Sequence, residues 1–216
     1  MNLWAYEAFI LDLDGTLIDS GKFHARAFAD SVLAENGYAL KPAEHHEFFA
    51  SHTNIFTGVL NERYGMDLDW KRVLQRKRKR MKEIFKAELF PGAQEFLDFW
   101  RGRKPMALAT NSPLAFVKPA LEEAGLLDYF DAVTTADEVE RRKPAPEIIE
   151  ISLQKLNVDA TRVLVFEDQL IGVDAALTAG TRVLAVNNGQ PVQFPDSIAV
   201  HTWNELLNLS VSHDES

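Results

Sequence analysis

Ala8-Phe9-Ile10-Leu11-Asp12-Leu13-Asp14-Gly15-Thr16 joins a short apolar run to two aspartates and a glycine. An apolar run without polar alternation is typical of a strand in a parallel sheet that is covered on both faces. Two carboxylates at the end of such a strand repel each other, and a buried carboxylate needs a partner or a metal ion. In open α/β sheets ligands bind at this edge. The stretch therefore predicts a functional site, although an ordinary Asp-Gly turn is the alternative.

Four further apolar runs have the length of buried strands: 106–109, 132–135, 163–166 and 183–186. Helical patterns lie between the later runs, at 116–124, 146–156 and 172–179. Proline near a helix start and glycine just past its end mark their limits. Alternating strands and helices predict an α/β fold, a doubly wound, mostly parallel five-stranded sheet with a Rossmann-like core.

The interval between the first and second strands breaks this alternation, because its roughly eighty residues far exceed an ordinary connection. It contains four helical patterns, at 21–36, 43–50, 54–64 and 70–88. We therefore predict a helical domain inserted at 18–88. Residues 1–17 and 89–210 would form the α/β core, and 211–216 a polar tail.

The composition of the 216-residue chain is that of a globular protein, with 46% hydrophobic and 25% charged residues. The absence of cysteine excludes a disulfide scaffold, a zinc-thiolate site and a thiol nucleophile. The formal net charge of −9 makes nucleic acid a poor partner. No apolar run approaches the ~20 residues of a membrane span, and no signal peptide is evident, so we expect a cytoplasmic protein. Nothing requires more than a monomer, and a dimer stays open.

Other strand ends bring more polar residues to the edge that carries the aspartates. Thr110 follows the second strand, and Glu167 with Asp168 follows the fourth. These oxygens suit Mg²⁺. Lys143, before a proline-opened helix, can neutralise an anionic ligand. Together they predict phosphoryl transfer, with one aspartate as nucleophile and a second carboxylic acid moving the proton.

In the order and spacing of these motifs the chain resembles the haloacid dehalogenase superfamily, in particular its β-phosphoglucomutase-like branch of phosphatases and mutases. The resemblance implies that Asp12 is the nucleophile and Asp14 the general acid and base. It implies that Thr110, the backbone N–H of Asn111 and Lys143 bind phosphate. Mg²⁺ would be held by Asp12, the backbone carbonyl of Asp14, Glu167 and Asp168. The inserted domain would be a cap that closes over the substrate.

Two cap residues are substrate-contact candidates. His24 lies ten residues after Asp14, where the similar mutase has a histidine that contacts the substrate; a packed histidine is the alternative. Lys77 lies in a basic run that includes Arg76 to Arg80, and helical spacing places it on the apolar stripe of Leu74 and Met81. For most of this run a solvated helix face is the simpler interpretation.

The sequence thus favours a Mg²⁺-dependent phosphatase acting on a small phosphorylated metabolite, a sugar phosphate above all. A phosphomutase with the same residues is the main alternative. A dehalogenase needs neither Asp14 nor the Glu167-Asp168 pair. A phospho-accepting regulatory domain would lack the second aspartate and the large insertion.

Overall fold

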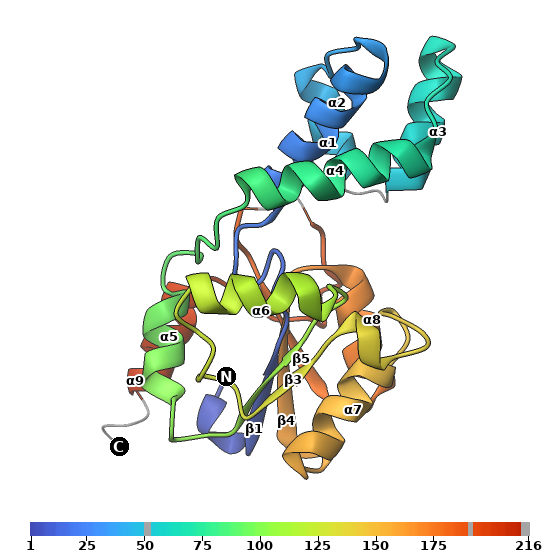
Figure 1. The fold of residues 1–216 in the computed structure, drawn as a ribbon. Coiled ribbons are helices and arrows are strands. Elements are labelled where there is room, and N and C mark those ends of the chain that lie inside the picture. Colours follow the sequence, from blue (N-terminus) through green and yellow to red (C-terminus); the bar gives the residue numbers. More distant parts are fainter. Residues whose placement is uncertain (50–52, 190–191, 213–216) are drawn as a thin grey trace. The chain divides into compact units, whose positions relative to one another are not determined.

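The computed structural model describes residues 1–49, 53–189 and 192–212 (Figure 1). The chain divides into two compact units. Met1–Asp19 with Ala87–Ser216 form one, the sheet unit, and Ser20–Lys86 form the other, the helical unit. The predicted limits of the inserted domain, 18 and 88, each differ from these by two residues. Of the predicted polar tail, residues 211 and 212 are helical, and 213–216 lie outside the described residues.

The sheet unit is built on a parallel sheet with the strand order β3-β2-β1-β4-β5-β6. The strands are β1 (Ala8–Leu11), β2 (Met106–Ala109), β3 (Ala132–Thr134), β4 (Val163–Glu167), β5 (Arg182–Val186) and β6 (Val200–His201). All residues of β1, β2 and β4 are buried, as their continuous apolar sequences require. Because β1 pairs with both β2 and β4, the polar residues that follow these three strands meet at one edge.

Helices cover both faces of the sheet, with α7 and α8 on one side and α5 and α9 on the other (Figure 1). The helices of this unit are η1 (Leu3–Ala5), α5 (Ala93–Trp100), α6 (Leu114–Glu123), η2 (Ala136–Glu138), α7 (Glu147–Leu156), η3 (Ala160–Arg162), α8 (Leu170–Thr178) and α9 (Trp203–Ser212). This arrangement confirms the predicted doubly wound α/β fold.

The face toward α5 and α9 is aromatic. Phe9 of β1 and Phe166 of β4 meet edge to face at 5.3 Å, and Phe96 and Trp203 pack against Phe166. The opposite face is aliphatic: Ala8, Ile10, Ala107, Val163 and Val165 pack with Ile148, Ile149, Ala175 and Ala176. Burial of each large side chain stabilises the fold by about 1.5–3 kcal/mol. The two layers therefore fix β1 beside β4, and with them the residues at their ends.

Two details of the sequence prediction were wrong. The sheet has six strands rather than five, since β6 is a two-residue strand paired only with β5 and leaves no pattern. The helix predicted at 70–88 ends at Ile84. After it the chain is extended, because Glu88 accepts a hydrogen bond from the N–H of Asp19 and Leu89 bridges Ile18. Pairing across the base of the insertion thus overrides the helical pattern.

The helical unit consists of α1 (Gly21–Asn36), α2 (Pro42–Phe49), α3 (Thr53–Tyr64) and α4 (Trp70–Ile84). Its core is formed by Phe28, Phe56, Leu60 and Val73 with their neighbours. The largely buried carboxylate of Glu35 on α1 pairs with two exposed arginines of α4, Arg72 and Arg76. None of the helices in the described part of the chain combines the length and apolar character that a bilayer crossing requires.

Candidate active site

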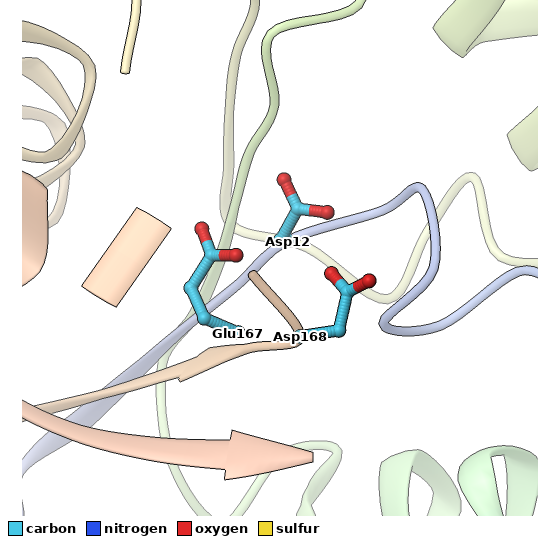
Figure 2. Close-up of side chains that lie close together, drawn as sticks. All are labelled: Asp12, Glu167 and Asp168. Atoms are coloured by element: carbon cyan, nitrogen blue, oxygen red, sulfur yellow. The ribbon is translucent and has the colours of Figure 1, made fainter. Parts of the chain in front are cut away.

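Three carboxylates gather where β1 and β4 end. Asp12 follows β1, Glu167 is the last residue of β4, and Asp168 comes next. Figure 2 shows their side chains directed toward a common space. One oxygen from each lies within 4.8 Å of the others, and all three residues are buried. Pairing of Leu11 with Phe166 in the sheet produces this proximity, since it sets the following residues side by side.

Lys143 supplies the positive charge of this cluster. Its Nζ lies 2.7 Å from Oδ1 of Asp12 and 2.5 Å from Oε1 of Glu167, and it donates to the carbonyl of Ala109 at 2.7 Å. The side chain is only 3% exposed. A lysine buried to this degree needs such partners. One ammonium group therefore links the ends of β1, β2 and β4.

The cluster carries more acid groups than the lysine can neutralise. Burial raises the pKa of Asp12 to about 8, with the nearby carboxylates adding to the effect and Lys143 opposing it. Burial likewise raises the pKa of Asp168 to about 7 and that of Glu167 to about 6. For Lys143 burial acts against the charge, but Asp12 and Glu167 outweigh it and raise its pKa. The site thus favours binding of additional positive charge.

Asp14 lies apart from the three carboxylates and contacts the segment after β2. Its Oδ2 accepts a 2.5 Å hydrogen bond from the hydroxyl of Ser112 and a 3.5 Å one from that of Thr110. Its Oδ1 is buried and has no hydrogen-bond partner among the described residues. Ser112 was not among the predicted site residues. It belongs to the polar stretch Thr110-Asn111-Ser112 that follows β2, but nothing in that stretch points to a contact with Asp14.

Asn111 and Glu147 hold the loop that carries Lys143. The side-chain amide of Asn111 accepts from the N–H of Lys143 at 3.0 Å and donates to its carbonyl at 3.3 Å. Glu147 accepts hydrogen bonds from the N–H groups of Glu140 and Arg141. The resemblance suggested phosphate binding by the backbone of Asn111. The structure adds that its side chain fixes the backbone of Lys143.

The turn after Asp14 packs tightly against Asp168. Gly15 has a φ of +88°, and a Cβ built on it would overlap the Asp168 carboxylate. The hydroxyl of Thr16 donates to Oδ1 of Asp168 at 2.9 Å. A glycine is required here both by the backbone conformation and by the neighbouring carboxylate. Gly15 and Thr16 of the Asp-x-Asp-Gly-Thr sequence therefore both contact Asp168.

The two cap candidates lie in the helical unit. His24 is on α1 and Lys77 is on α4, and both side chains are partly buried. The buried residues of α4 are Val73 and Met81, so the apolar side of the helix includes Val73 and is wider than the predicted stripe. Contact of His24 or Lys77 with a substrate stays a prediction.

Comparison with known proteins identifies the family. A family model described as haloacid dehalogenase-like hydrolase matches residues 9–186. The fructose-1-phosphate phosphatase YqaB of Escherichia coli K12 is 32% identical over 81% of this chain and 93% of its own length. The phosphorylated carbohydrates phosphatase of Thermotoga maritima is 30% identical over 94% of this chain and 97% of its own.

A solved structure shows the same fold over most of the chain. It is a Thermotoga maritima protein provisionally named β-phosphoglucomutase, with a TM-score of 0.77 and 29% identity over 95% of this chain and 99% of that one. The buried acidic cluster and its lysine thus occur in a chain whose family, fold and relatives agree. The chain belongs to the haloacid dehalogenase-like hydrolases and is a phosphatase of that family.

Proposed function

We propose that this chain is a Mg²⁺-dependent phosphatase that hydrolyses a sugar phosphate through an aspartyl phosphate on Asp12. The observation that carries the proposal is the position of Asp12. Its carboxylate lies beside the ammonium group of Lys143 and faces Glu167 and Asp168 within 4.8 Å. A nucleophile in this position has a cation and a divalent-metal site next to it, as attack on a phosphate dianion requires.

The residues present fit a magnesium ion. Hard oxygen ligands come from Asp12 and Asp168, with Glu167 adjacent, and the resemblance adds the backbone carbonyl of Asp14. Burial raises the pKa of all three carboxylates, and the neighbouring carboxylates add to this effect. A bound Mg²⁺ would offset the charge of the phosphoryl oxygens and keep the carboxylates ionised.

The chemical step uses side chains of the sheet unit. An oxygen of Asp12 attacks phosphorus, and the bond from phosphorus to the sugar oxygen breaks. Asp14, protonated at that stage, gives its proton to the leaving oxygen. Water then attacks the aspartyl phosphate, Asp14 takes a proton from it, and inorganic phosphate leaves with Asp12 restored.

Three groups would hold the phosphoryl oxygens during this transfer. Lys143 neutralises part of their charge, while the hydroxyl of Thr110 and the backbone N–H of Asn111 donate hydrogen bonds. Thr110 and Asn111 directly follow β2, and Lys143 reaches the same strand end through the carbonyl of Ala109. Their common position supports a single phosphate-binding site at this edge.

The relatives support a carbohydrate as the substrate. One is named for fructose 1-phosphate and another for phosphorylated carbohydrates. We assign the choice among sugars to the helical unit, with His24 and Lys77 as candidate contacts. A mutase would share the chemistry of Asp12 and Asp14 but return the phosphoryl group to a sugar hydroxyl.

The test is phosphate release from a panel of hexose and pentose phosphates, with Mg²⁺ or EDTA. Native protein should release phosphate only with Mg²⁺, and Asp12→Asn should abolish release. Asp98→Asn, an exposed aspartate on α5, is the matched control and should behave as the native protein.

Other products would point to other functions. Conversion of a hexose 1-phosphate to its 6-phosphate without phosphate release would establish the mutase. Chloride release from a haloacid in EDTA would establish a dehalogenase. A stable aspartyl phosphate without turnover would establish a phospho-acceptor.

A further inference from the structure

A side chain outside the recognised motifs contacts the turn that carries both catalytic aspartates. Nδ2 of Asn188 donates hydrogen bonds to the carbonyl of Gly15 and to the carbonyl of Thr16, each at 2.9 Å. The contact joins residues more than 170 positions apart in the chain. An amide NH₂ has two hydrogens, so one side chain satisfies both carbonyls.

A second donor acts on the same turn. The indole Nε1 of Trp203, at the start of α9, donates to the carbonyl of Thr16 at 2.9 Å. Trp203 is fully buried in the aromatic layer between the sheet and α5. The carbonyl of Thr16 therefore accepts from two side chains, one of which is anchored in the core.

The loop that presents Asn188 is itself held in place. Asn187 pairs through its N–H with the carbonyl of His201 in β6, at 2.9 Å. Its side chain accepts from the N–H of Gly189, which adopts a φ of +83°. This closed turn directs the intervening residue toward Gly15 and Thr16. The short strand β6, which the sequence did not reveal, thereby contributes to the position of Asn188.

Different side chains hold different groups of the Asp12–Thr16 turn. Asp168 holds the hydroxyl of Thr16 and fits against the Cα of Gly15. Asn188 and Trp203 hold the carbonyls. Asp14 directly precedes Gly15, and Asp12 lies two residues before Asp14. A shift of the turn would therefore move both of them relative to Lys143 and Ser112.

We propose that Asn188 is a positioning residue of the phosphatase reaction, which holds the Asp12–Thr16 turn in its reactive geometry together with Trp203. This role rests on the proposed function, in which Asp12 and Asp14 carry the chemistry. Displacement of reacting groups by about 1 Å can reduce a rate by ~100-fold. Loss of Asn188 should therefore lower kcat while the KM for the sugar phosphate changes little, because both donors of its amide are directed to the turn.

The experiment compares kcat and KM, at a temperature well below unfolding, for two pairs of variants. Asn188→Ala removes both donors. Asn188→Asp keeps the shape but turns carboxylate oxygens toward the carbonyls. Trp203→Phe removes the indole donor, and its control is Trp100→Phe. Trp100 is an equally buried tryptophan whose Nε1 donates to Ser210 on α9 and not to the turn.

We expect kcat to fall by ~10- to 100-fold in Asn188→Ala, at least as much in Asn188→Asp, and measurably in Trp203→Phe. Trp100→Phe should lower the melting temperature and leave kcat within about twofold of the native value. If both Asn188 variants keep native kcat while their melting temperature falls, Asn188 is only structural and the proposal is overturned. If Asn188→Ala does not fold, the comparison of kcat between Trp203→Phe and Trp100→Phe is the test. Equal kcat values in these two variants would then overturn the proposal.

Failure of the proposed function would look different. In that case the native protein would release no phosphate with Mg²⁺, or Asp12→Asn would retain the activity. Native activity that depends on Asp12 but not on Asn188 would overturn the positioning role alone.

Discussion

Replacement of Lys143 by methionine tests whether this lysine compensates the buried carboxylates. Methionine keeps much of the apolar stem but removes the ammonium group and its contacts with Asp12, Glu167 and the carbonyl of Ala109. Breaking a buried ion pair by removing one partner costs about 3–5 kcal/mol. We expect the metal-free variant to lose this much stability at pH 8.

The loss should depend on pH with a defined sign. The buried acids can replace the missing charge by taking up a proton, and their pKa values already lie above those of free carboxyl groups. The folded variant then binds one proton more than the native protein does. Its stability falls with rising pH by an additional 1.4 kcal/mol or so per unit. Between pH 6 and pH 8 the penalty should therefore grow by about 3 kcal/mol.

The assay is urea unfolding in EDTA, followed by tryptophan fluorescence, at pH 6 and pH 8. Three of the four tryptophans, Trp4, Trp100 and Trp203, lie in the sheet unit, so the signal reports mainly on it. The control is Lys155→Met. Lys155 also contacts a carboxylate and a carbonyl, but its side chain is 33% exposed.

The exposed control should cost less than about 1 kcal/mol at either pH. A loss below about 1 kcal/mol for Lys143→Met at pH 8, or an equal loss at both pH values, would refute the reasoning. The first result would mean that the carboxylates do not depend on the lysine, and the second that no proton replaces it.

Three other outcomes are expected. Gly172→Ala should lower activity by ~10-fold or more, because its Cβ would overlap the carboxylate of Glu167. The control Gly58→Ala, in α3, has open space around it and should keep native activity. Equal activities of the two variants would contradict this expectation. Saturating Mg²⁺ should raise the melting temperature by roughly 5–10 °C. The gain should be larger at pH 8 than at pH 6, because protons compete with the metal for carboxylates whose pKa is raised by burial. A larger gain at pH 6 would contradict this reasoning. Burial opposes ionisation of Glu44, but hydrogen bonds from Tyr64, Lys41 and Tyr38 lower its pKa. The helical unit should therefore lose stability as the pH falls below about 4.5, and Glu44→Gln should remove that dependence in acid-titration circular dichroism.

Sequence reasoning predicted the bounds of an element best where burial or a single terminating glycine determines them. The strands that are buried on both faces had to be continuous apolar runs, and the bounds of β1 and β2 agree with those predicted. The limits of α1 also agree, since Gly37 in a left-handed conformation ends it. The helices α5 and α9 and the strand β6 were not predicted. Strand β6 is too short for a pattern, and its pairing with β5 is visible only in three dimensions.

For the site, the sequence supplied the acids and the lysine but not the residues that orient them. Ser112 contacts Asp14, which lies 98 positions away in the chain. Asn188 contacts Gly15 and Thr16, more than 170 positions away. No periodicity or local motif records such a contact. The side chain of Asn111 is an intermediate case, because its residue was predicted for its backbone and the structure shows a separate use of its amide.

The site is organised to maintain unfavourable charge. If Asp12, Glu167 and Asp168 served stability alone, apolar residues of similar volume would suit their buried positions better. Instead, the surroundings accommodate the carboxylates. Glycines at 15 and 172 leave room for those of Asp168 and Glu167, and a single lysine offsets part of their charge. The negative charge that remains would attract a divalent cation. That cation and Lys143 would together offset the charge of a phosphoryl group, so the feature that costs stability is the one that phosphate transfer would use.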